Sequence, residues 1–216
     1  MKILITGAAG MLGRTLVRRW SAAHAVIAAD RARLDITSAD ACLAVIGAAQ
    51  PDAVVHCAAH TAVDRCESEP ERAHLLNATG SANVAVACQR AGARLLAIST
   101  DYVFAGDRPR DQAYHEGDAT GPRTVYGTSK LAGEAAVRAQ CADHVIARVA
   151  WLYGPGGPSF VHTMLALGRQ GGAPLRVVDD QIGNPTSTDA VADALLPPRS
   201  IWFSRGTTMA GRFAFR

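Results

Sequence analysis

A glycine-rich turn near the N-terminus limits the possible folds of this 216-residue chain more than any other pattern in it. The apolar run 2–6 ends at Gly7, and Gly10 and Gly13 follow at three-residue intervals before a segment of helical period. Glycine at such positions permits a tight turn, lets backbone N–H groups approach a pyrophosphate and lets helix and strand pack closely. The N-terminus of the following helix adds a partial positive charge. The turn therefore predicts a dinucleotide-binding strand–turn–helix.

An acidic residue stands where a ribose-binding carboxylate is expected. Asp30 lies 17 residues after Gly13, close to the expected spacing of ~20 residues. A carboxylate favours the 2′-hydroxyl of NADH, whereas the neighbouring Arg31 favours the 2′-phosphate of NADPH, so the sequence leaves this preference open. Asp35 and Ile36 follow shortly after. They either edge the adenine pocket or form the turn before the next helix.

Short apolar runs alternate with longer segments of helical period along the chain, which is typical of βαβ units. We expect strands at Lys2–Thr6, Val26–Ala29, Ala53–Cys57, Arg94–Ser99, His144–Val149 and Leu175–Val178. We expect helices at Met11–Ala22, Ala39–Ala48, Pro70–Ala91, Tyr126–Ala139 and Ser159–Arg169. Thr37 or Ser38 would cap the second helix, and Pro70 would lie in the first turn of the third.

These elements predict an α/β fold with a Rossmann-type, doubly wound parallel sheet, because both faces of such a sheet are covered by helices and its strands are apolar throughout. We assign residues 1–150 to an NAD(P)-binding domain that carries the catalytic residues. Residues 151–216 would form a small, incomplete C-terminal substrate lobe. Ligands bind such sheets at the carboxyl ends of the strands, where the polar loop 105–123 and the glycine–proline loop 154–158 both begin.

Composition and charge argue against several function classes. Hydrophobic residues make up 49% of the chain and charged residues 19%, and the net charge of +3 is scattered, so we do not expect nucleic acid as a partner. No apolar run approaches the ~18 residues that indicate a membrane span. Because the first strand begins at residue 2, we expect no signal peptide and a cytoplasmic protein.

The cysteines are odd in number, widely separated and without a Cys-x-x-Cys pair; they are Cys42, Cys57, Cys66, Cys88 and Cys141. This pattern favours reduced, mostly buried thiols over a disulfide framework or a metal site.

Tyr126 and Lys130 form the second chemical motif, at the spacing Tyr-x-x-x-Lys. On a helix this spacing puts both side chains on one face, with Cβ atoms ~5–6 Å apart. A phenol has a pKa of ~10, and lowering it by ~3 units needs ~4 kcal/mol, which Lys130 and a positive nicotinamide ring are suited to supply. Thr100 would lie at the end of the fourth strand and orient a substrate carbonyl. A surface Tyr/Lys pair is the alternative, but the position behind a phosphate turn favours hydride chemistry.

Six segments together resemble the extended short-chain dehydrogenases/reductases of nucleotide-sugar metabolism, and within them the dTDP-4-dehydrorhamnose reductase family. The segments are Thr6–Gly13, Cys57–Asp64, Ser99–Phe104, Tyr126–Lys130, Ala150–Gly154 and Asp179–Thr186. The similarity covers about residues 1–196. It implies reduction of the C4 ketone of dTDP-4-dehydro-L-rhamnose by NADPH or NADH, with Tyr126 donating the proton. A homodimer is compatible with it.

The resemblance also implies roles for individual residues. Gly10, Met11 and Leu12 would line the phosphates, and Ala59, His60 and Thr61 would line the cofactor beyond the third strand. Thr100 and Asp101 would contact the sugar, and Trp151 the nucleotide-sugar pocket. Trp151 has the alternative of a buried core aromatic. His60 has the alternative of a loop histidine bonded to backbone, and we give it no acid–base role.

The sequence departs from the family in two places. Some members bind Mg²⁺ through a carboxylate at the position of Thr15, so we expect no metal here, although Asp189 stands where another such acid could lie. Family members also continue well past this length, and residues 197–216 look like a blurred version of their next strand and helix start. We therefore expect a shortened product that binds cofactor better than substrate. The alternatives are another nucleotide-sugar reductase or epimerase, or a cofactor-binding regulatory subunit without turnover.

Overall fold

A computed structural model describes residues 1–109, 111–171, 174–195 and 207–210. Its centre is a six-stranded sheet in the order β2-β1-β3-β4-β5-β8, in which every neighbouring pair is parallel. The strands are β1 Lys2–Thr6, β2 Ala25–Ala29, β3 Ala53–His56, β4 Arg94–Thr100, β5 His144–Val149 and β8 Thr207–Ala210. β2 lies on one side of β1 and β3 on the other, so the strand order reverses between β1 and β3. Open α/β sheets bind ligands at the carboxyl ends of the strands beside such a reversal. The predicted α/β class is confirmed.

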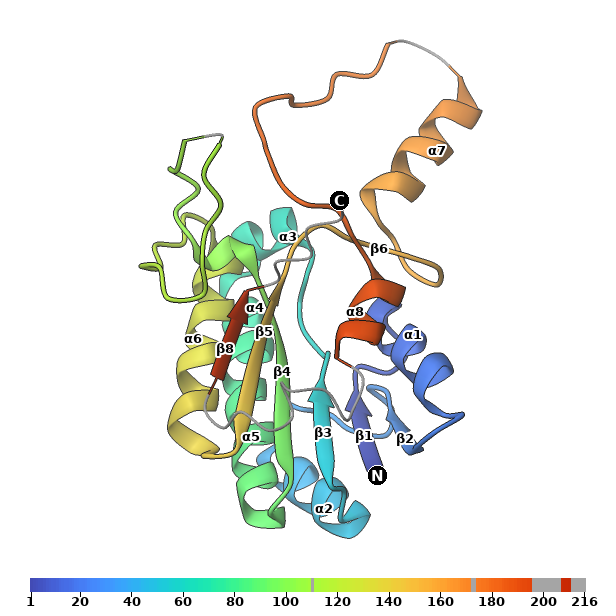
Figure 1. Ribbon diagram of the computed structural model, residues 1–216, viewed down its shortest axis with the longest axis vertical. Coiled ribbons are helices and arrows are strands. Elements are labelled where there is room, and N and C mark those ends of the chain that lie inside the picture. Colours follow the sequence, from blue (N-terminus) through green and yellow to red (C-terminus); the bar gives the residue numbers. More distant parts are fainter. Residues whose placement is uncertain (110, 172–173, 196–206, 211–216) are drawn as a thin grey trace.

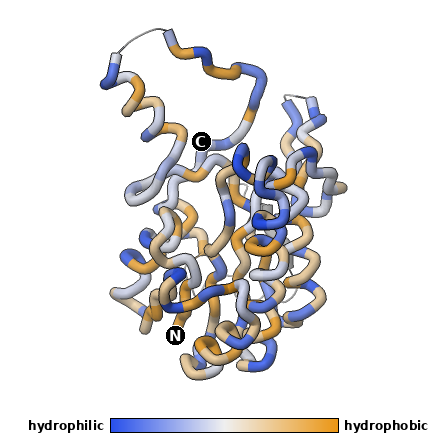
Figure 2. The backbone as a smooth tube through the Cα atoms, turned by 180° about the vertical axis from the view of Figure 1, so that it is seen from behind, coloured by the Kyte–Doolittle hydropathy of each residue, from blue (hydrophilic) through white to orange (hydrophobic). Residues whose placement is uncertain are grey.

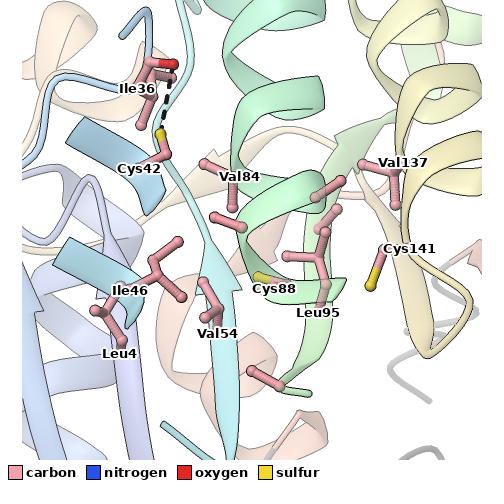
Figure 3. Packing of buried hydrophobic residues seen from close by; sticks show 14 of the residues in the cluster. Leu4, Ile36, Cys42, Ile46, Val54, Val84, Cys88, Leu95, Val137 and Cys141 are labelled. Atoms are coloured by element: carbon pink, nitrogen blue, oxygen red, sulfur yellow. Dashed lines mark hydrogen bonds between the residues drawn. The ribbon is translucent and has the colours of Figure 1, made fainter. Parts of the chain in front are cut away.

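Helices cover both faces of the sheet (Figure 1). One face is covered by α2 Ala39–Ala49, α5 Gly80–Ala91 and α6 Val125–Gln140, and the other by α1 Met11–Trp20 and α8 Thr188–Ala194. Successive strand residues point to opposite faces, so Leu4 and Val54 pack with the first group while Ile5 and Val55 pack with the second. Figure 3 shows the first of these clusters, where Leu4, Ile46, Val84 and Leu95 meet.

The predicted helix over residues 70–91 is confirmed as one continuous helical run with a π-helical turn inside it. It comprises α4 Pro70–His74, the π-helical segment η1 Leu75–Thr79 and α5, and the short α3 Val63–Ser68 precedes it. Pro70 begins α4, as predicted. Of the two candidate caps for α2, Ser38 is the one used, because its Oγ accepts from the Ala41 N–H at 3.2 Å. The 3₁₀ turn η2 Asp101–Val103 directly follows β4.

Residues 150–171 and 174–187 leave the body around the sheet (Figure 1). They contain α7 Phe160–Gln170 and a parallel pair of two-residue strands, β6 Leu152–Tyr153 and β7 Thr186–Ser187. Figure 2 shows that hydrophobic residues also occur along α7 and the segment after it. Several of these are exposed, among them Phe160, Leu165 and Ile182.

The predicted strand Leu175–Val178 is wrong. These residues have no regular structure, and Leu175 and Val178 are more than half exposed. The prediction assumed that an apolar run is buried between two layers, but the described part of the chain places β8 beside β5, in register from Val145↔Thr207 to Arg148↔Ala210. The C-terminal segment 197–216 was expected to contain a strand, and residues 207–210 form β8. Residues 196–206 and 211–216 lie outside the described residues.

The helix α8 returns from the lobe to pack on α1. Trp20 Nε1 donates to the Ala192 carbonyl at 3.1 Å, and Thr15 Oγ1 donates to Thr188 Oγ1 at 3.0 Å. Asp189, named above as a position for a metal-binding acid, is ion-paired with Arg18 at 2.6 Å. Within the described ranges no three His, Cys, Asp or Glu side chains gather as a metal site would require, and no helix there is long and apolar enough to cross a bilayer.

Candidate active site

The glycine turn between β1 and α1 is closely packed against the end of β3. A Cβ on Gly7, which has φ +65°, would lie 2.6 Å from the Ala58 nitrogen, and one on Gly13 would lie 2.3 Å from the Gly7 oxygen. Gly10 is the N-cap of α1, and the first turn of that helix contains no acidic residue. Since no side chain caps this terminus and no carboxylate opposes an anion there, the turn fits a pyrophosphate.

A second loop lies against the start of α1. A Cβ on Gly157 would come within 2.6 Å of Met11 Cβ, and one on Gly156 within 3.1 Å of Arg14 Cδ. The glycine–proline loop 154–158 therefore reaches the phosphate turn, as its place after β5 suggested. Leu12, predicted to line the phosphates, has its side chain buried in the cluster between α1 and the sheet, so only its backbone is available there.

The ribose end of the candidate site lies at the carboxyl end of β2. Asp30 is exposed, and its Oδ1 accepts from the Arg33 N–H at 3.1 Å. Arg31 and Arg33 are exposed beside it. One acidic and two basic residues thus follow one another along the chain at the position that distinguishes a hydroxyl from a phosphate.

Asp35 and Ile36 are occupied by local structure. Asp35 Oδ1 accepts from the Thr37 N–H at 3.0 Å and from its hydroxyl at 2.7 Å, and these bonds lower the pKa of Asp35. The Ile36 side chain is buried against Gly80, where a Cβ would lie 2.6 Å from Ile36 Cδ1. Of the two alternatives left open, the turn before α2 is the one that this geometry matches.

The loop after β3 is held by a residue that the sequence analysis did not single out. Asn77, buried within η1, accepts from the His60 N–H at 2.7 Å and donates to the His60 carbonyl at 3.1 Å. Its Nδ2 also donates to Ser129 Oγ at 2.9 Å, between the two residues of the Tyr-x-x-x-Lys motif. The available signal was an asparagine in the interior of a predicted helix, where it is unfavourable without a special contact.

His60 lies in this loop and is held through its own backbone, but its ring Nε2 is buried without a hydrogen-bond partner among the described residues, so the alternative of a histidine bonded to backbone is not what the structure has. Its ring Nε2 lies 3.6 Å from Glu69 Oε2, a carboxylate that also pairs with Arg65 and Arg72. Ala59 and Thr61 flank it along the same loop, which continues from the Cys57–Ala58 backbone beside the glycine turn.

Tyr126 lies in the first turn of α6 and is buried. Thr124 caps this helix by accepting from the Gly127 N–H at 3.0 Å. The Thr100 side chain lies near enough to the Tyr126 hydroxyl to act on its pKa, and the ring packs edge-on against Tyr102 with centroids 5.5 Å apart. Burial raises the pKa of Tyr126 to about 12, and the nearby Thr100 side chain acts in the opposite direction. A protonated phenol thus faces the hydroxyl predicted to orient a carbonyl.

Lys130 shares the buried face of α6 with Tyr126, as the four-residue spacing predicts. Its Nζ donates to the Ile98 carbonyl of β4 at 2.8 Å. Burial lowers the pKa of Lys130 to about 8, while the Glu134 carboxylate acts in the opposite direction. The expected lowering of the Tyr126 pKa is therefore not found: burial is the largest influence on both groups, and it holds the phenol protonated.

The remaining predicted substrate residues lie at the same edge of the sheet. Asp101 follows Thr100, and its Oδ1 accepts a hydrogen bond from the Thr100 hydroxyl at 3.1 Å. Burial raises the pKa of Asp101. Trp151 comes two residues after Val149, which pairs with Thr100 in the sheet. It is 42% exposed, which argues against the core alternative, and its φ of +44° is rare for a bulky residue. Such strain is often found at functional sites.

Comparison with known proteins gives a consistent result. A family model described as the RmlD substrate binding domain matches residues 1–199. The dTDP-4-dehydrorhamnose reductase of Mycolicibacterium smegmatis is 48% identical over 197 residues, which are 90% of this chain and 59% of that protein. The spore coat polysaccharide biosynthesis protein SpsK of Bacillus subtilis is 43% identical, over 90% of this chain and 68% of its own length.

A solved structure agrees in fold. The dTDP-4-dehydrorhamnose reductase of Bacillus anthracis, in complex with NADP, superposes with a TM-score of 0.85 at 41% identity, over 89% of this chain and 68% of that one. The chain described here spans 59% and 63% of the lengths of the M. smegmatis and Streptomyces griseus reductases.

Proposed function

The chain belongs to the RmlD substrate binding domain family, and from that premise we propose that it reduces the C4 ketone of dTDP-4-dehydro-L-rhamnose to dTDP-L-rhamnose with NADPH or NADH. One observation carries this proposal above the others. The buried Tyr126 hydroxyl lies beside Thr100 at the carboxyl edge of a parallel sheet whose glycine turn fits a pyrophosphate. A proton donor and a dinucleotide cradle on one edge are what reduction of a ketone requires.

The cofactor would be held by backbone and by a few side chains. The Gly7–Gly13 turn would hold the pyrophosphate, and Asp30 with Arg31 the adenosine ribose. The Ala59–Thr61 loop and Lys130 would hold the nicotinamide half. When bound, the nicotinamide supplies the hydride that reaches the carbonyl carbon.

The chain itself would supply the proton and orient the substrate. Tyr126 donates its phenolic proton to the carbonyl oxygen as the hydride reaches the carbon, so that an alcohol and a tyrosinate are formed. Thr100 orients the oxygen by its hydroxyl, and Lys130, charged below a pKa of about 8, stabilises the tyrosinate. Burial of the phenol at a pKa of about 12 supports its role as an acid rather than a base at neutral pH.

The substrate lobe would lie within residues 151–185, with Trp151 against the nucleotide-sugar. We assign the dinucleotide domain to residues 1–150 together with α8, because α8 packs on α1. All five cysteines are free and four are buried, which supports a reducing compartment such as the cytoplasm. A homodimer and the absence of nucleic-acid partners remain predictions.

Turnover and binding are measured separately to test the proposal. NADPH or NADH oxidation is followed by absorbance in the presence of dTDP-4-dehydrorhamnose, and the affinity of each dinucleotide is measured by calorimetry. We expect Tyr126→Phe to lower kcat by about 10²–10⁴-fold while the dinucleotide affinity stays unchanged.

Two results would contradict the assignment. Undiminished turnover in Tyr126→Phe would remove the catalytic role of the phenol. Dinucleotide binding without any turnover or dTDP-sugar binding in the wild type would instead support the alternative of a cofactor-binding regulatory subunit.

A further inference from the structure

Glu134 continues the row of α6 residues formed by Tyr126 and Lys130. Each follows the previous one by four residues, so all three lie on the face of α6 that packs on the sheet. Glu134 is 3% exposed, and its Oε1 accepts from Ser99 Oγ at 2.6 Å. A buried carboxylate is costly unless it is paired and hydrogen-bonded. The hydride chemistry proposed above gives this carboxylate no task.

Arg148 of β5 is the buried partner of Glu134. Its Nε and Nη2 donate to the two carboxylate oxygens at 2.8 and 2.7 Å, a two-point pair, while Arg138 donates to Oε2 at 2.9 Å from the exposed side. Arg148 pairs with Ser99 in the sheet, the residue before Thr100. The ion pair therefore joins α6, β4 and β5 directly behind the candidate catalytic residues.

The same guanidinium also contacts the loop between β4 and α6. Arg148 Nη1 donates to the Glu116 carbonyl at 3.2 Å, and the guanidinium lies 4.9 Å from the centre of the Phe104 ring. Phe104 stacks on Tyr114 with centroids 4.5 Å apart, and Arg108 lies 4.9 Å from the Tyr114 ring. A row of planar groups thus runs from the buried ion pair out along this loop, which Figure 1 shows projecting beyond the carboxyl edge of the sheet.

We propose that Glu134 and Arg148 are positioning residues that fix the 104–123 loop to the Tyr126–Lys130 face of α6, so that one ion pair sets both the placement of the loop and the charge environment of Lys130. The consequence for turnover rests on the proposed function, whereas the two structural consequences do not.

The charge environment of Lys130 is formed by few groups. Cys57 and His56 face it from the end of β3, the Ile98 carbonyl from β4 and Glu134 from its own helix. Burial lowers the pKa of His56 to about 3 and raises that of Cys57 to about 12, so both are neutral near pH 7. Glu134 is then the one of these groups that carries charge, and loss of its charge lowers the pKa of Lys130 further.

The sequence allows a direct measurement, because Lys2 and Lys130 are its only lysines. In protein labelled with ¹³Cε-lysine, two resonances are titrated by NMR, and the exposed Lys2 serves as an internal reference. We expect Glu134→Gln to move the Lys130 midpoint to lower pH by about one unit and to leave Lys2 unchanged. The control Glu71→Gln removes the same charge at an exposed position of α4 and should move neither. An unchanged Lys130 midpoint in Glu134→Gln would overturn the proposal.

Loop placement is measured by hydrogen–deuterium exchange of peptides within 111–123. Arg148→Lys keeps the charge but loses the planar fork, and we expect exchange in these peptides to rise about tenfold or more, as for a lost hydrogen bond to a charged group. Arg90→Lys, an exposed change on α5, should leave exchange as in the wild type. Unaltered loop exchange in a folded Arg148→Lys protein would contradict the loop half of the proposal.

Unfolding of a single variant would not end the test. The double variant Glu134→Gln/Arg148→Gln removes both members of the buried ion pair together, and its loop exchange should still rise. If the wild type turns over, the basic limb of its kcat profile should shift in Glu134→Gln together with the NMR midpoint, while NADPH affinity stays constant. A merely structural role would not produce this shared shift. If the wild type has no turnover but the NMR and exchange results hold, the proposed function fails and this inference stands.

Discussion

Lys130 is a charged side chain in a position that penalises its charge. Its pKa is lowered from 10.5 to about 8 by burial, and its ammonium bonds one backbone carbonyl, that of Ile98. The unfolded chain therefore binds a proton more tightly than the folded one. The stability cost is full below pH 8, where both states are protonated, and is relieved as the pH rises from 8 to 10.5.

Lys130→Met should therefore stabilise the fold while removing activity. A pKa shift of this size corresponds to about 3 kcal/mol of destabilisation, which the substitution relieves. Loss of the hydrogen bond to the Ile98 carbonyl offsets about 1 kcal/mol of that gain. We expect the free energy of unfolding at pH 7 to rise by about 1–2 kcal/mol, measured by urea titration. The gain should shrink between pH 8 and pH 10. Destabilisation at pH 7, or a gain that grows at high pH, would mean that burial does not dominate at this site.

Asn77 shows how a single irregular element positions two parts of the site. The π-helical turn η1 brings its amide to both backbone groups of His60 and to Ser129 on α6. The same turn brings the Asn77 carbonyl close to α6, where a Cβ on Gly133 would lie 2.2 Å from it. A π-turn inserts one residue into a helix, and such insertions are frequent at functional sites.

Asn77→Ala removes the partner of the buried Ser129 hydroxyl and of the part-buried N–H and carbonyl of His60, so it should cost about 2–4 kcal/mol of unfolding free energy. Asn83→Ala, on the following helix, removes one hydrogen bond, which the side-chain amide donates to the Ile36 carbonyl at 2.9 Å. This change should cost about 1 kcal/mol of unfolding free energy. Only the first change alters the loop beside the glycine turn. We therefore expect NADPH affinity, measured by calorimetry, to fall in Asn77→Ala alone; equal affinities in both variants would separate Asn77 from the cofactor site.

The elements were predictable where local sequence decides them. β5 has its predicted bounds, His144–Val149, because four of its six residues are apolar, as is typical of a strand buried on both faces. The apolar run Leu175–Val178 has the same composition but no neighbouring strand to pair with, and composition alone does not reveal which sheet edge is open. The π-helical turn inside the predicted 70–91 helix carries a contact of Asn77 with Ser129, 52 positions away, which no local pattern encodes.

The residues of the candidate site were predictable where a sequence motif identifies them. The glycine turn, Thr100, Tyr126 and Lys130 lie where the spacing predicts, at one edge of the sheet. Their ionisation was not predictable, because it depends on burial: the same four-residue spacing on an exposed helix would leave both pKa values near normal. The sequence did not predict the buried pair Glu134 and Arg148, because charged residues on a helix and a strand are ordinarily surface residues.

At the scale of the whole molecule, the chain passes from the sheet and its helices into the lobe around α7 and then back again. It leaves the sheet after β5, forms the lobe around α7 and returns as α8, which covers Trp20 and Leu16 of α1. A division at residue 150 therefore separates segments that share one hydrophobic cluster. A domain boundary normally falls where few contacts cross.

A chain ending at residue 150 should consequently be much less stable than one ending at residue 195. The shorter chain loses α8 and exposes the side chains that Val191 and Leu195 help to cover, each buried apolar side chain contributing about 1.5–3 kcal/mol. It also loses the Ala192 carbonyl that accepts from Trp20. We expect a fall of more than about 3 kcal/mol in unfolding free energy. With Trp151→Phe in the longer chain, so that Trp20 is the tryptophan of both, Trp20 fluorescence in the shorter chain should shift toward that of an exposed indole. Because the chain ending at 195 retains α8, it isolates this contribution from that of β8. Equal stability and equal Trp20 emission in the two chains would show that residues 1–150 fold as an independent unit.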